Sequence, residues 1–461
     1  MKLTPVRAEE YPSYPLYVVY NKQVSMIVPV LRKAAASLIR AGTGAGAAGI
    51  AARSASAPGG RSSARWVFGG HGKYGELRSQ LLALALGTFG FFAAINDSLK
   101  FVIALLADIF KNRHQTYSSG PAQVHLHLKS IVATSQTEAR KSEFRPRRGL
   151  RGGHVQTIAS LFLHRRMVLP ASEQRLIEVE PGTKILCHCH WQADRTNALT
   201  ALLVHGLEGS SESGYMLGIA EKGLAAGMNV VRMNQRNCGG TEGLSPTLYH
   251  SGRSADLAAV AESLIRNDKI SRLALVGFSM GGNLVLKLAG EWGREGPAEF
   301  RTVVAVCPAV DLAASADALH VRGNRIYEQY FLVQLRRRLR EKARLFPEVF
   351  DPMRLQGVKT LREFDDKITA HYCGFEGAAD YYARSAAANV VNRIAVPAFI
   401  LHAANDPFIR ILPQTREKIL ANPSITFVET EDGGHCSFIA DRNGYDGHWA
   451  ERQVVEFLRK S

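Results

Sequence analysis

The five residues Gly277-Phe278-Ser279-Met280-Gly281 have the composition and spacing of a nucleophile site. They follow the apolar run Leu273–Val276 and precede the helix-like stretch Asn283–Leu288. In the G-x-S-x-G motif, a sharp turn between a strand and a helix lifts a serine hydroxyl clear of the sheet. The motif alone is a weak signal in a glycine-rich chain, so the prediction depends on the flanking strand and helix. Ser279 is the candidate nucleophile.

A serine hydroxyl becomes a good nucleophile when a neutral imidazole removes its proton and a carboxylate orients that imidazole. The chain order expected with this motif is serine, then acid, then histidine. Asp406 follows the predicted strand Val396–His402, and His435 follows the predicted strand Ile425–Glu429. Both therefore lie at the carboxyl ends of strands, the edge at which Ser279 emerges. We predict that Asp406 is the orienting acid and His435 the general base.

Other assignments stay open from the sequence. Asp406 precedes a proline and is also compatible with a simple turn, and a histidine that follows two glycines, as His435 does, is also compatible with an ordinary loop position. Asp311 is the reserve acid because it follows another predicted strand. His402 ends a strand and His448 begins the terminal helix, so structural roles are expected for both.

The negative charge that develops on a substrate carbonyl during attack is stabilised by preorganised backbone amides. One amide is expected from Met280, directly after the candidate nucleophile. The other is expected from Leu207 in the run His205-Gly206-Leu207, where glycine lets the backbone approach closely. His205 itself is expected to be a structural residue of this loop.

From Phe144 onward, short apolar runs alternate with helix-like stretches, which predicts an α/β fold with a mostly parallel sheet and helices on both faces. A hairpin at 175–191 is expected to open the domain. Further strands are expected at 199–204, 229–233, 273–277, 302–307, 396–402 and 425–429, and helices at 215–226, 252–267 and 283–290. The interval of about 311–392 has no strand pattern and is expected to be a helical cap inserted after the sixth strand.

The predicted cap is rich in arginine and lysine. Spacings of three to six place an apolar set on one helix face, namely Ile326, Tyr330, Val333, Leu339, Ala343 and Phe346. Basic residues crowd the remainder, namely Arg336, Arg337, Arg338, Arg340, Lys342 and Arg344. The simplest interpretation is a solvated basic face. The alternative is that this face docks on anionic lipid and presents acyl substrates to the pocket.

Residues 1–140 differ in composition from the rest of the chain. The stretch 32–66 is rich in Ala, Ser, Gly and Arg and has no acid, which is typical of a low-complexity or transit-like segment. Its glycines at 44, 46 and 49 lack the preceding strand that dinucleotide binding needs. The apolar runs 81–95 and 101–110 are too short to cross a hydrocarbon core of roughly 30 Å, and they predict a buried or membrane-surface helical pair.

The formal charge of +16 is concentrated before residue 150, so the remainder of the chain is nearly balanced in charge. A catalytic domain that binds nucleic acid is therefore not expected. The first ten residues lack the pattern of a secretory signal, and a cytoplasmic location is the default expectation. Peripheral membrane contact, if present, is expected through the N-terminal apolar region or the basic cap helix.

The six cysteines contain no C-x-x-C pair, which argues against a disulfide scaffold and against a structural zinc site. The run Cys187-His188-Cys189-His190 is typical of a strand. Because successive strand side chains point to opposite faces, its two thiols and two imidazoles cannot all converge on one ion. No metal or organic cofactor is expected, since serine-based acyl transfer needs neither.

From about residue 144 to 461 the chain resembles the YheT-like branch of α/β hydrolases, whose relatives include plant embryogenesis-associated hydrolases and mammalian α/β-hydrolase-domain phospholipases. The resemblance rests on five blocks in order: Gly152–Thr157, Val204–Gly209, Asn234–Gly240, Tyr249–Gly252 and Gly277–Asn283. It implies an α/β-hydrolase domain over 141–461 and carboxylic ester hydrolase activity, in some relatives on phospholipids. It also implies a Ser-Asp-His triad that maps onto Ser279, Asp406 and His435. It does not extend to residues 1–140.

These features predict a serine esterase that cleaves carboxylic esters, with medium-chain or lipid esters as candidates, through an acyl-enzyme intermediate. A catalytically silent binding protein is one alternative, although all three triad residues are present. A lipid acyltransferase is another, although the H-x-x-x-x-D pattern of some such enzymes occurs nowhere in the chain. A dehalogenase is disfavoured because its nucleophile would be a carboxylate at position 279.

Overall fold

The computed structural model describes residues 140–141, 144–163, 165 and 167–461. The low-complexity stretch 32–66, its three glycines and the apolar runs 81–95 and 101–110 lie outside the described residues. Membrane contact through that N-terminal region therefore stays a prediction. Within the described residues, no helix has the length and apolar character needed to cross a membrane.

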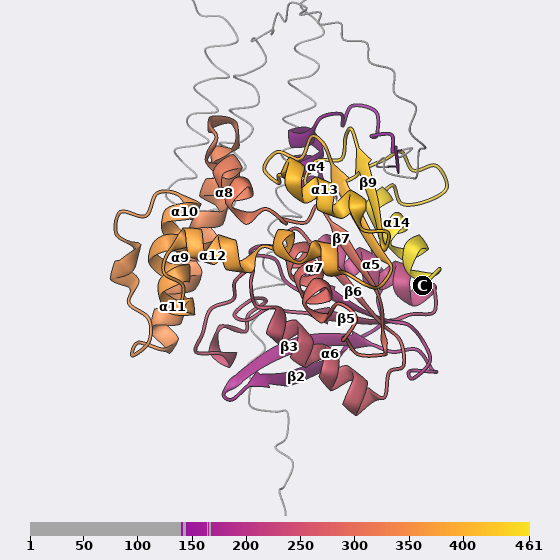
Figure 1. The fold of residues 1–461 in the computed structure, drawn as a ribbon, viewed down its shortest axis with the longest axis horizontal. Helices are drawn as coiled ribbons and strands as arrows, with labels where there is room; N and C mark the ends of the chain where they lie inside the picture. Colours follow the sequence, from indigo (N-terminus) through magenta and orange to yellow (C-terminus); the bar gives the residue numbers. More distant parts are fainter. Residues whose placement is uncertain (1–139, 142–143, 164, 166) are drawn as a thin grey trace, which may run out of the picture. The chain divides into compact units, whose positions relative to one another are not determined.

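A nine-stranded sheet forms the centre of the described chain, in the order β1-β9-β8-β7-β6-β4-β5-β3-β2. The strands are β1 (Arg140–Lys141), β2 (Glu173–Glu180), β3 (Thr183–His190), β4 (Thr200–Val204), β5 (Asn229–Met233), β6 (Leu273–Phe278), β7 (Phe300–Val306), β8 (Ala398–Ala403) and β9 (Ile425–Thr430). β2 pairs with β3 and β3 with β5 in antiparallel fashion, and the other neighbours are parallel (Figure 1). The predicted α/β fold with a mostly parallel sheet is confirmed.

The central strands form where short apolar runs lie between turns. β4, β5 and β6 are buried along their whole length, as parallel strands covered on both faces must be. The predicted strand bounds agree with the structure to within two residues. β1 was not predicted, because two residues carry no periodic pattern.

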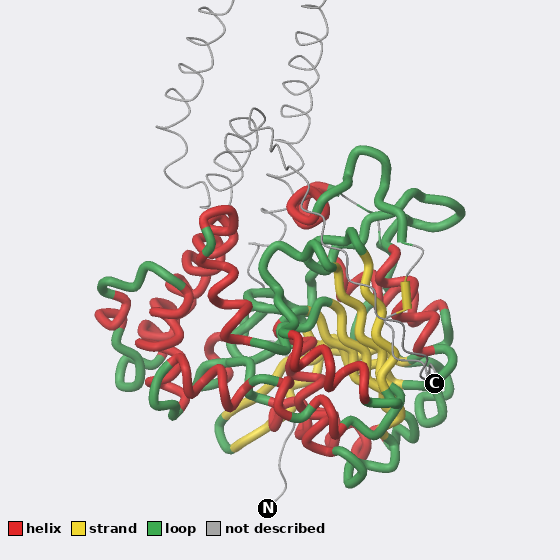
Figure 2. Tube along the Cα trace, turned by 45° about the horizontal axis from the view of Figure 1, so that its top comes forward, coloured by secondary structure: helices red, strands yellow, loops and turns green. Residues whose placement is uncertain are grey.

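Helices cover both faces of the sheet, as Figure 2 shows. On one face, α5 (Gly214–Ala225) and α14 (Trp449–Leu458) pack against the strands through residues such as Met216 and Val454. On the other face, α6 (Ser254–Asp268), α7 (Met280–Trp292) and α13 (Pro413–Ala421) do the same. The helices α5, α6 and α7 lie where the sequence predicts them.

The chain between β7 and β8 contains no strand, and we call its residues 311–393 the cap segment. It comprises short 3-10 and π turns and the helices α8 (Leu312–His320), α9 (Arg325–Leu345), α10 (Leu361–Phe364), α11 (His371–Cys373) and α12 (Ala378–Ser385). These helices gather on one side of the sheet in Figure 1. They share a separate apolar core, with Leu332 and Ile368 fully buried in it.

The orientation of α9 differs from the prediction. Its buried face carries Tyr327, Glu328, Leu332, Leu335, Leu339 and Lys342, whereas the predicted members Ile326, Tyr330 and Val333 are half-buried. The prediction of a solvated basic face is wrong for Arg338, whose side chain is 12% exposed, and for Lys342, which is fully buried. Both are held by polar groups of other loops, which a helical-wheel argument cannot detect.

Candidate active site

Ser279 lies at the turn between β6 and α7. Its backbone has φ 55° and ψ −118°, a strained conformation for a residue that is not glycine. A Cβ on Gly281 would lie 2.3 Å from the Val204 carbonyl oxygen, so only glycine lets the helix start this close to β4. The two features together hold the Ser279 hydroxyl at the carboxyl edge of the sheet.

The loops after β8 and β9 bring Asp406 and His435 together. Nδ1 of His435 lies 2.8 Å from Oδ2 of Asp406. The other carboxylate oxygen of Asp406 accepts hydrogen bonds from the amides of Phe408 at 3.1 Å and Ile409 at 2.9 Å. Asp406 is therefore a buried, fully bonded carboxylate that sets the orientation of the imidazole and directs Nε2 away from itself.

The pKa values of Asp406 and His435 are shifted in opposite directions. Burial raises the pKa of Asp406, but the charge of His435 outweighs it, and the pKa lies below the ordinary value. Burial lowers the pKa of His435, but the negative charges of the neighbouring Cys436 and of the Asp406 carboxylate outweigh it, and the pKa lies well above the ordinary value. Both shifts follow from an oriented imidazole beside an ionised carboxylate.

Ser279 and His435 line one groove, although within the described chain the Ser279 hydroxyl forms no direct hydrogen bond to His435. The Nε2 atom of His435 instead lies 4.0 Å from the sulfur of Cys436. Hydrogen bonds between a nucleophile and its base are often long without substrate and tighten in the reacting complex. The structure therefore brings Asp406 to His435 directly and brings Ser279 to the same groove.

The loop after β4 approaches Ser279 closely. A Cβ on Gly206 would lie 3.0 Å from the Cβ of Ser279, and the Gly206 amide donates to the Tyr215 hydroxyl at 3.0 Å. Among the described residues, no acceptor pairs with the amide of Leu207 or of Met280. Two unpaired amides near a serine can stabilise an oxyanion.

Two cavities meet at Ser279. The first, which we call the cap pocket, has a volume of about 100 Å³ and is lined mainly by apolar residues that include Leu248, Leu312, Leu335, Leu361 and Phe364. The second, which we call the histidine groove, has a volume of about 550 Å³ and is lined by residues that include Thr157, Tyr215, Tyr327, His435 and Cys436. Leu207, Ser279, Phe331 and Phe408 line both cavities.

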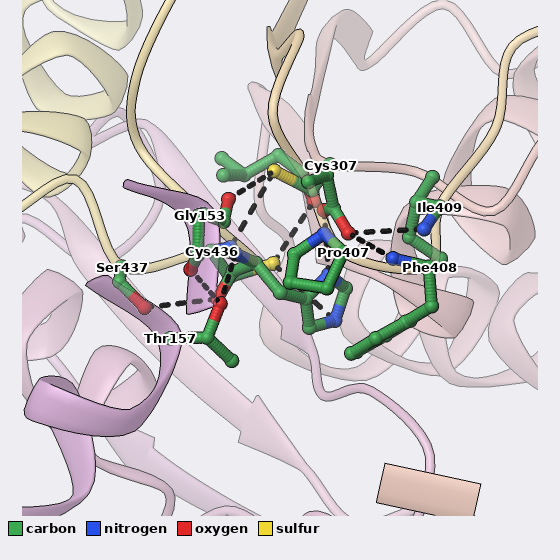
Figure 3. A network of polar contacts seen from close by, with 12 residues as sticks. Gly153, Thr157, Cys307, Pro407, Phe408, Ile409, Cys436 and Ser437 are labelled. Carbon is green, nitrogen blue, oxygen red and sulfur yellow. Dashed lines mark hydrogen bonds and ion pairs between the residues drawn. The ribbon is translucent and has the colours of Figure 1, made fainter. Parts of the chain in front are cut away.

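Sequence reasoning assigned no role to the residues that hold the histidine loop. Thr157 on α4 (Gly153–Phe162) accepts a hydrogen bond from the His435 amide at 2.8 Å and donates to the Gly153 carbonyl at 2.7 Å. Figure 3 shows Thr157 in the polar network that also contains Cys307 and Cys436. The block Gly152–Thr157 is one of the five motifs that carry the family resemblance. Thr157 and His435 are 278 positions apart in the chain, so no local pattern indicates their contact.

The remaining acid and histidine candidates are committed to other contacts. Asp311 accepts from the Leu412 amide and the Thr415 hydroxyl, both at 2.8 Å, and so lies at the start of α13. His205 is fully buried and accepts from the Gln235 amide at 3.1 Å. His402 is buried behind Asp406, and His448 lies 4.0 Å from Glu451 at the start of α14.

The fold and the site identify a class of protein. A family model described as alpha/beta hydrolase fold matches residues 202–441, and the chain belongs to this family. The matched range contains Leu207, Ser279, Met280, Asp406 and His435.

The relatives of this chain include an esterase and a phospholipase by name. The chain is 31% identical to "Putative esterase YheT" of Escherichia coli over 337 residues, which cover 72% of this chain and 97% of that protein. It is 24% identical to embryogenesis-associated protein EMB8 of Picea glauca, over 66% of this chain and 69% of that protein. It is 27% identical to mouse phospholipase ABHD3, over 54% of this chain and 60% of that protein.

Proposed function

We propose that this protein is a serine hydrolase that cleaves carboxylic esters. The observation that carries the proposal is the 2.8 Å contact between His435 and the buried Asp406, in a groove that Ser279 also lines from a strained strand-to-helix turn. A serine, an oriented imidazole and two unpaired amides are the groups that acyl transfer requires. Relatives named as esterases and phospholipases support the same class of reaction.

In the proposed mechanism, His435 Nε2 takes the Ser279 proton while the serine oxygen attacks the ester carbonyl carbon. The carbonyl electron pair moves to oxygen, where the amides of Leu207 and Met280 stabilise the charge. The tetrahedral intermediate collapses, the ester C–O bond breaks, and the imidazolium gives its proton to the departing alcohol. Water then repeats the sequence on the acyl-enzyme, releasing the acid and the free serine.

The two cavities suggest how the ester is placed. The cap pocket is mostly apolar and suits an acyl chain, since burial of apolar surface is its main source of binding energy. The histidine groove suits the alcohol or headgroup, because His435 must protonate the leaving oxygen. Medium-chain and lipid esters are therefore the proposed substrates.

The test is hydrolysis of a p-nitrophenyl ester series of increasing acyl length by the full chain and by Ser279→Ala. We expect an optimum at an intermediate chain length and a loss of about 10⁴-fold or more in kcat for the variant. A fluorophosphonate probe should label the wild type and Ser437→Ala, which removes another hydroxyl of the same groove, but not Ser279→Ala. An unlabelled and inactive wild type would favour a silent binding protein.

Acyl transfer to an alcohol instead of water is measured in the same assay. Adding a short alcohol should leave the acid as the main product if the protein is a hydrolase. A dominant new ester would instead assign it to the acyltransferases.

Contact with a membrane surface is part of the proposal for lipid esters. Arg337 and Arg340 on α9 are exposed and are the proposed contacts with anionic lipid, whereas Arg338 and Lys342 are used inside the protein. Flotation with vesicles that contain anionic lipid should recover more protein than flotation with neutral vesicles. Equal recovery from both would remove the basic helix as a docking face.

A further inference from the structure

Two cysteines lie beside the candidate general base, and the proposed mechanism uses neither. Cys436 follows His435 directly, and its sulfur lies 4.0 Å from His435 Nε2. Cys307 follows β7 and lies under the same loop, where its sulfur accepts from the Cys436 amide at 3.4 Å and approaches the Gly434 carbonyl at 3.6 Å. Figure 3 shows both sulfur atoms within one polar network.

The geometry of these groups approximates a metal site. The two sulfurs and a ring nitrogen of His435 all lie within 4.8 Å of one another. In a tetrahedral zinc site with Zn–S near 2.3 Å and Zn–N near 2.0 Å, ligand atoms are roughly 3.5 to 3.8 Å apart. A contraction of about 1 Å or less would therefore let all three donors reach one ion.

The donor types favour a thiophilic ion. Two thiolates and an imidazole are the ligands that Zn²⁺ prefers over carboxylate-rich sets. Among the described residues, a second group combines Cys307 with His402 and Asp406, but these three are all buried and line neither cavity. Asp406 is also fully used by His435 and two amides. The group of Cys307, His435 and Cys436 is therefore the candidate ion site.

The histidine groove supplies the entry path. His435 and Cys436 both line it, whereas Cys307 is fully buried behind them. An ion that enters from the groove meets two donors at once and reaches Cys307 by a short further step.

We propose that Cys307, Cys436 and His435 form a site for Zn²⁺, and that the bound ion reversibly inhibits the enzyme. Both sulfurs bind the ion as thiolates, any proton that they still hold is released, and the ion occupies the Nε2 lone pair that would otherwise accept the Ser279 proton. The inhibition rests on the proposed function, because it requires His435 to act as the general base. Binding of the ion requires only the three donors.

The first experiment measures binding without activity. Co²⁺ is titrated into the full chain carrying Ser279→Ala, which keeps all three donors. We expect one Co²⁺ per chain with a thiolate-to-cobalt charge-transfer band. The band should be lost in Ser279→Ala/Cys436→Ala and kept in Ser279→Ala/Cys373→Ala, which removes a partly buried thiol outside the site. Circular dichroism verifies that each variant is folded. A band that survives the loss of Cys436 would overturn the proposed site.

The second experiment measures inhibition by Zn²⁺, with each variant compared with its own activity in chelator. The half-inhibitory concentration should rise at least about 10-fold in Cys436→Ala, since even an outer-shell partner is worth 10-fold or more in metal affinity. It should stay at the wild-type value in Cys373→Ala, and chelator should restore the wild type. Equal zinc sensitivity of the wild type and Cys436→Ala would overturn the inhibition. If the chelator-treated wild type hydrolyses no ester, the proposed function fails, and the cobalt spectrum still decides whether the ion site exists.

Discussion

Two regions border Ser279 and are held in place by different contacts. The loops at the carboxyl edge of the sheet are fixed by close approaches at glycine, as at Gly206 and Gly281, and by hydrogen bonds of their backbone amides, as from Gly206 to the Tyr215 hydroxyl. The cap segment is fixed by side chains, through an apolar core of its own and through buried ion pairs. The close approaches at glycine leave a short local motif in the sequence, and the side-chain contacts of the cap segment do not.

The clearest of these side-chain contacts is made by Arg338 on α9. It contacts both carboxylate oxygens of Glu208, at 2.8 and 3.0 Å, and Glu242 at 3.1 Å. Glu208 follows Leu207, the candidate oxyanion residue, and its side chain is 4% exposed. A charged side chain on the surface of α9 therefore connects the cap segment to the loop after β4. Charge density alone therefore does not indicate exposure to solvent.

The largest expected change in kcat comes from a substitution in the loops at the edge of the sheet. Asp406→Asn should lower kcat by about 10⁴-fold, because the amide no longer holds the imidazole in the useful tautomer. The matched control is Asp311→Asn, since the Asp311 carboxylate is bonded to Leu412 and Thr415 and not to His435. Steady-state kinetics on both variants make the comparison. A larger loss in the Asp311 variant would move the acid from residue 406 to residue 311.

The next largest change in kcat is expected where the loop after β4 approaches Ser279. Gly206→Ala should lower kcat by about 100-fold, because the added Cβ would lie 3.0 Å from the Ser279 Cβ and displace the nucleophile or the Leu207 amide. Gly243→Ala is the control, since a Cβ there meets no atom within 4 Å. If the two variants are equally active, glycine is not required at residue 206.

A smaller effect is expected at the connection between the two regions. Arg338→Met should lower the free energy of unfolding by about 3 kcal/mol, because it leaves the buried Glu208 carboxylate without its cation and with the Tyr249 hydroxyl as a donor. The kcat should fall about 10-fold, a fraction of the ~10²-fold loss that follows removal of an oxyanion donor. Denaturant unfolding and ester kinetics measure the two quantities.

Two further variants sharpen this test. Arg340→Met changes an exposed arginine of the same helix and should alter neither quantity. Arg338→Met/Glu208→Gln removes the stranded charge and should recover part of the lost stability. Were the double variant less stable than additivity predicts, the ion pair would not be the cause.

The smallest effect is a shift in pH dependence. His435 must be neutral to accept a proton, so activity should rise with pH through its pKa, which Cys436 and Asp406 hold above the ordinary value. Cys436→Ala removes one raising contact, so the acid limb of kcat/KM should move to lower pH. Cys373→Ala should leave the profile where it is. A limb that moves to higher pH would show that the thiol does not raise the pKa of His435.

Local patterns in the sequence predict the central strands, their order along the chain and the placing of the candidates Ser279, Asp406 and His435 after three of those strands. Apolar runs between turns predict parallel strands, and residues after such strands share one edge of the sheet, so three distant residues could be placed near each other. These inferences use local patterns and one rule of topology.

The arrangement of the cap segment and of the contacts that support the site follows from no local pattern. The contacts of Thr157 with His435, of Arg338 with Glu208 and of Cys307 with Cys436 join residues more than one hundred positions apart. No periodicity records such pairs, because each side chain looks ordinary in its own segment. Burial of Lys342 and Arg338 depends on the loops that pack against α9, and those loops are supplied by other parts of the chain.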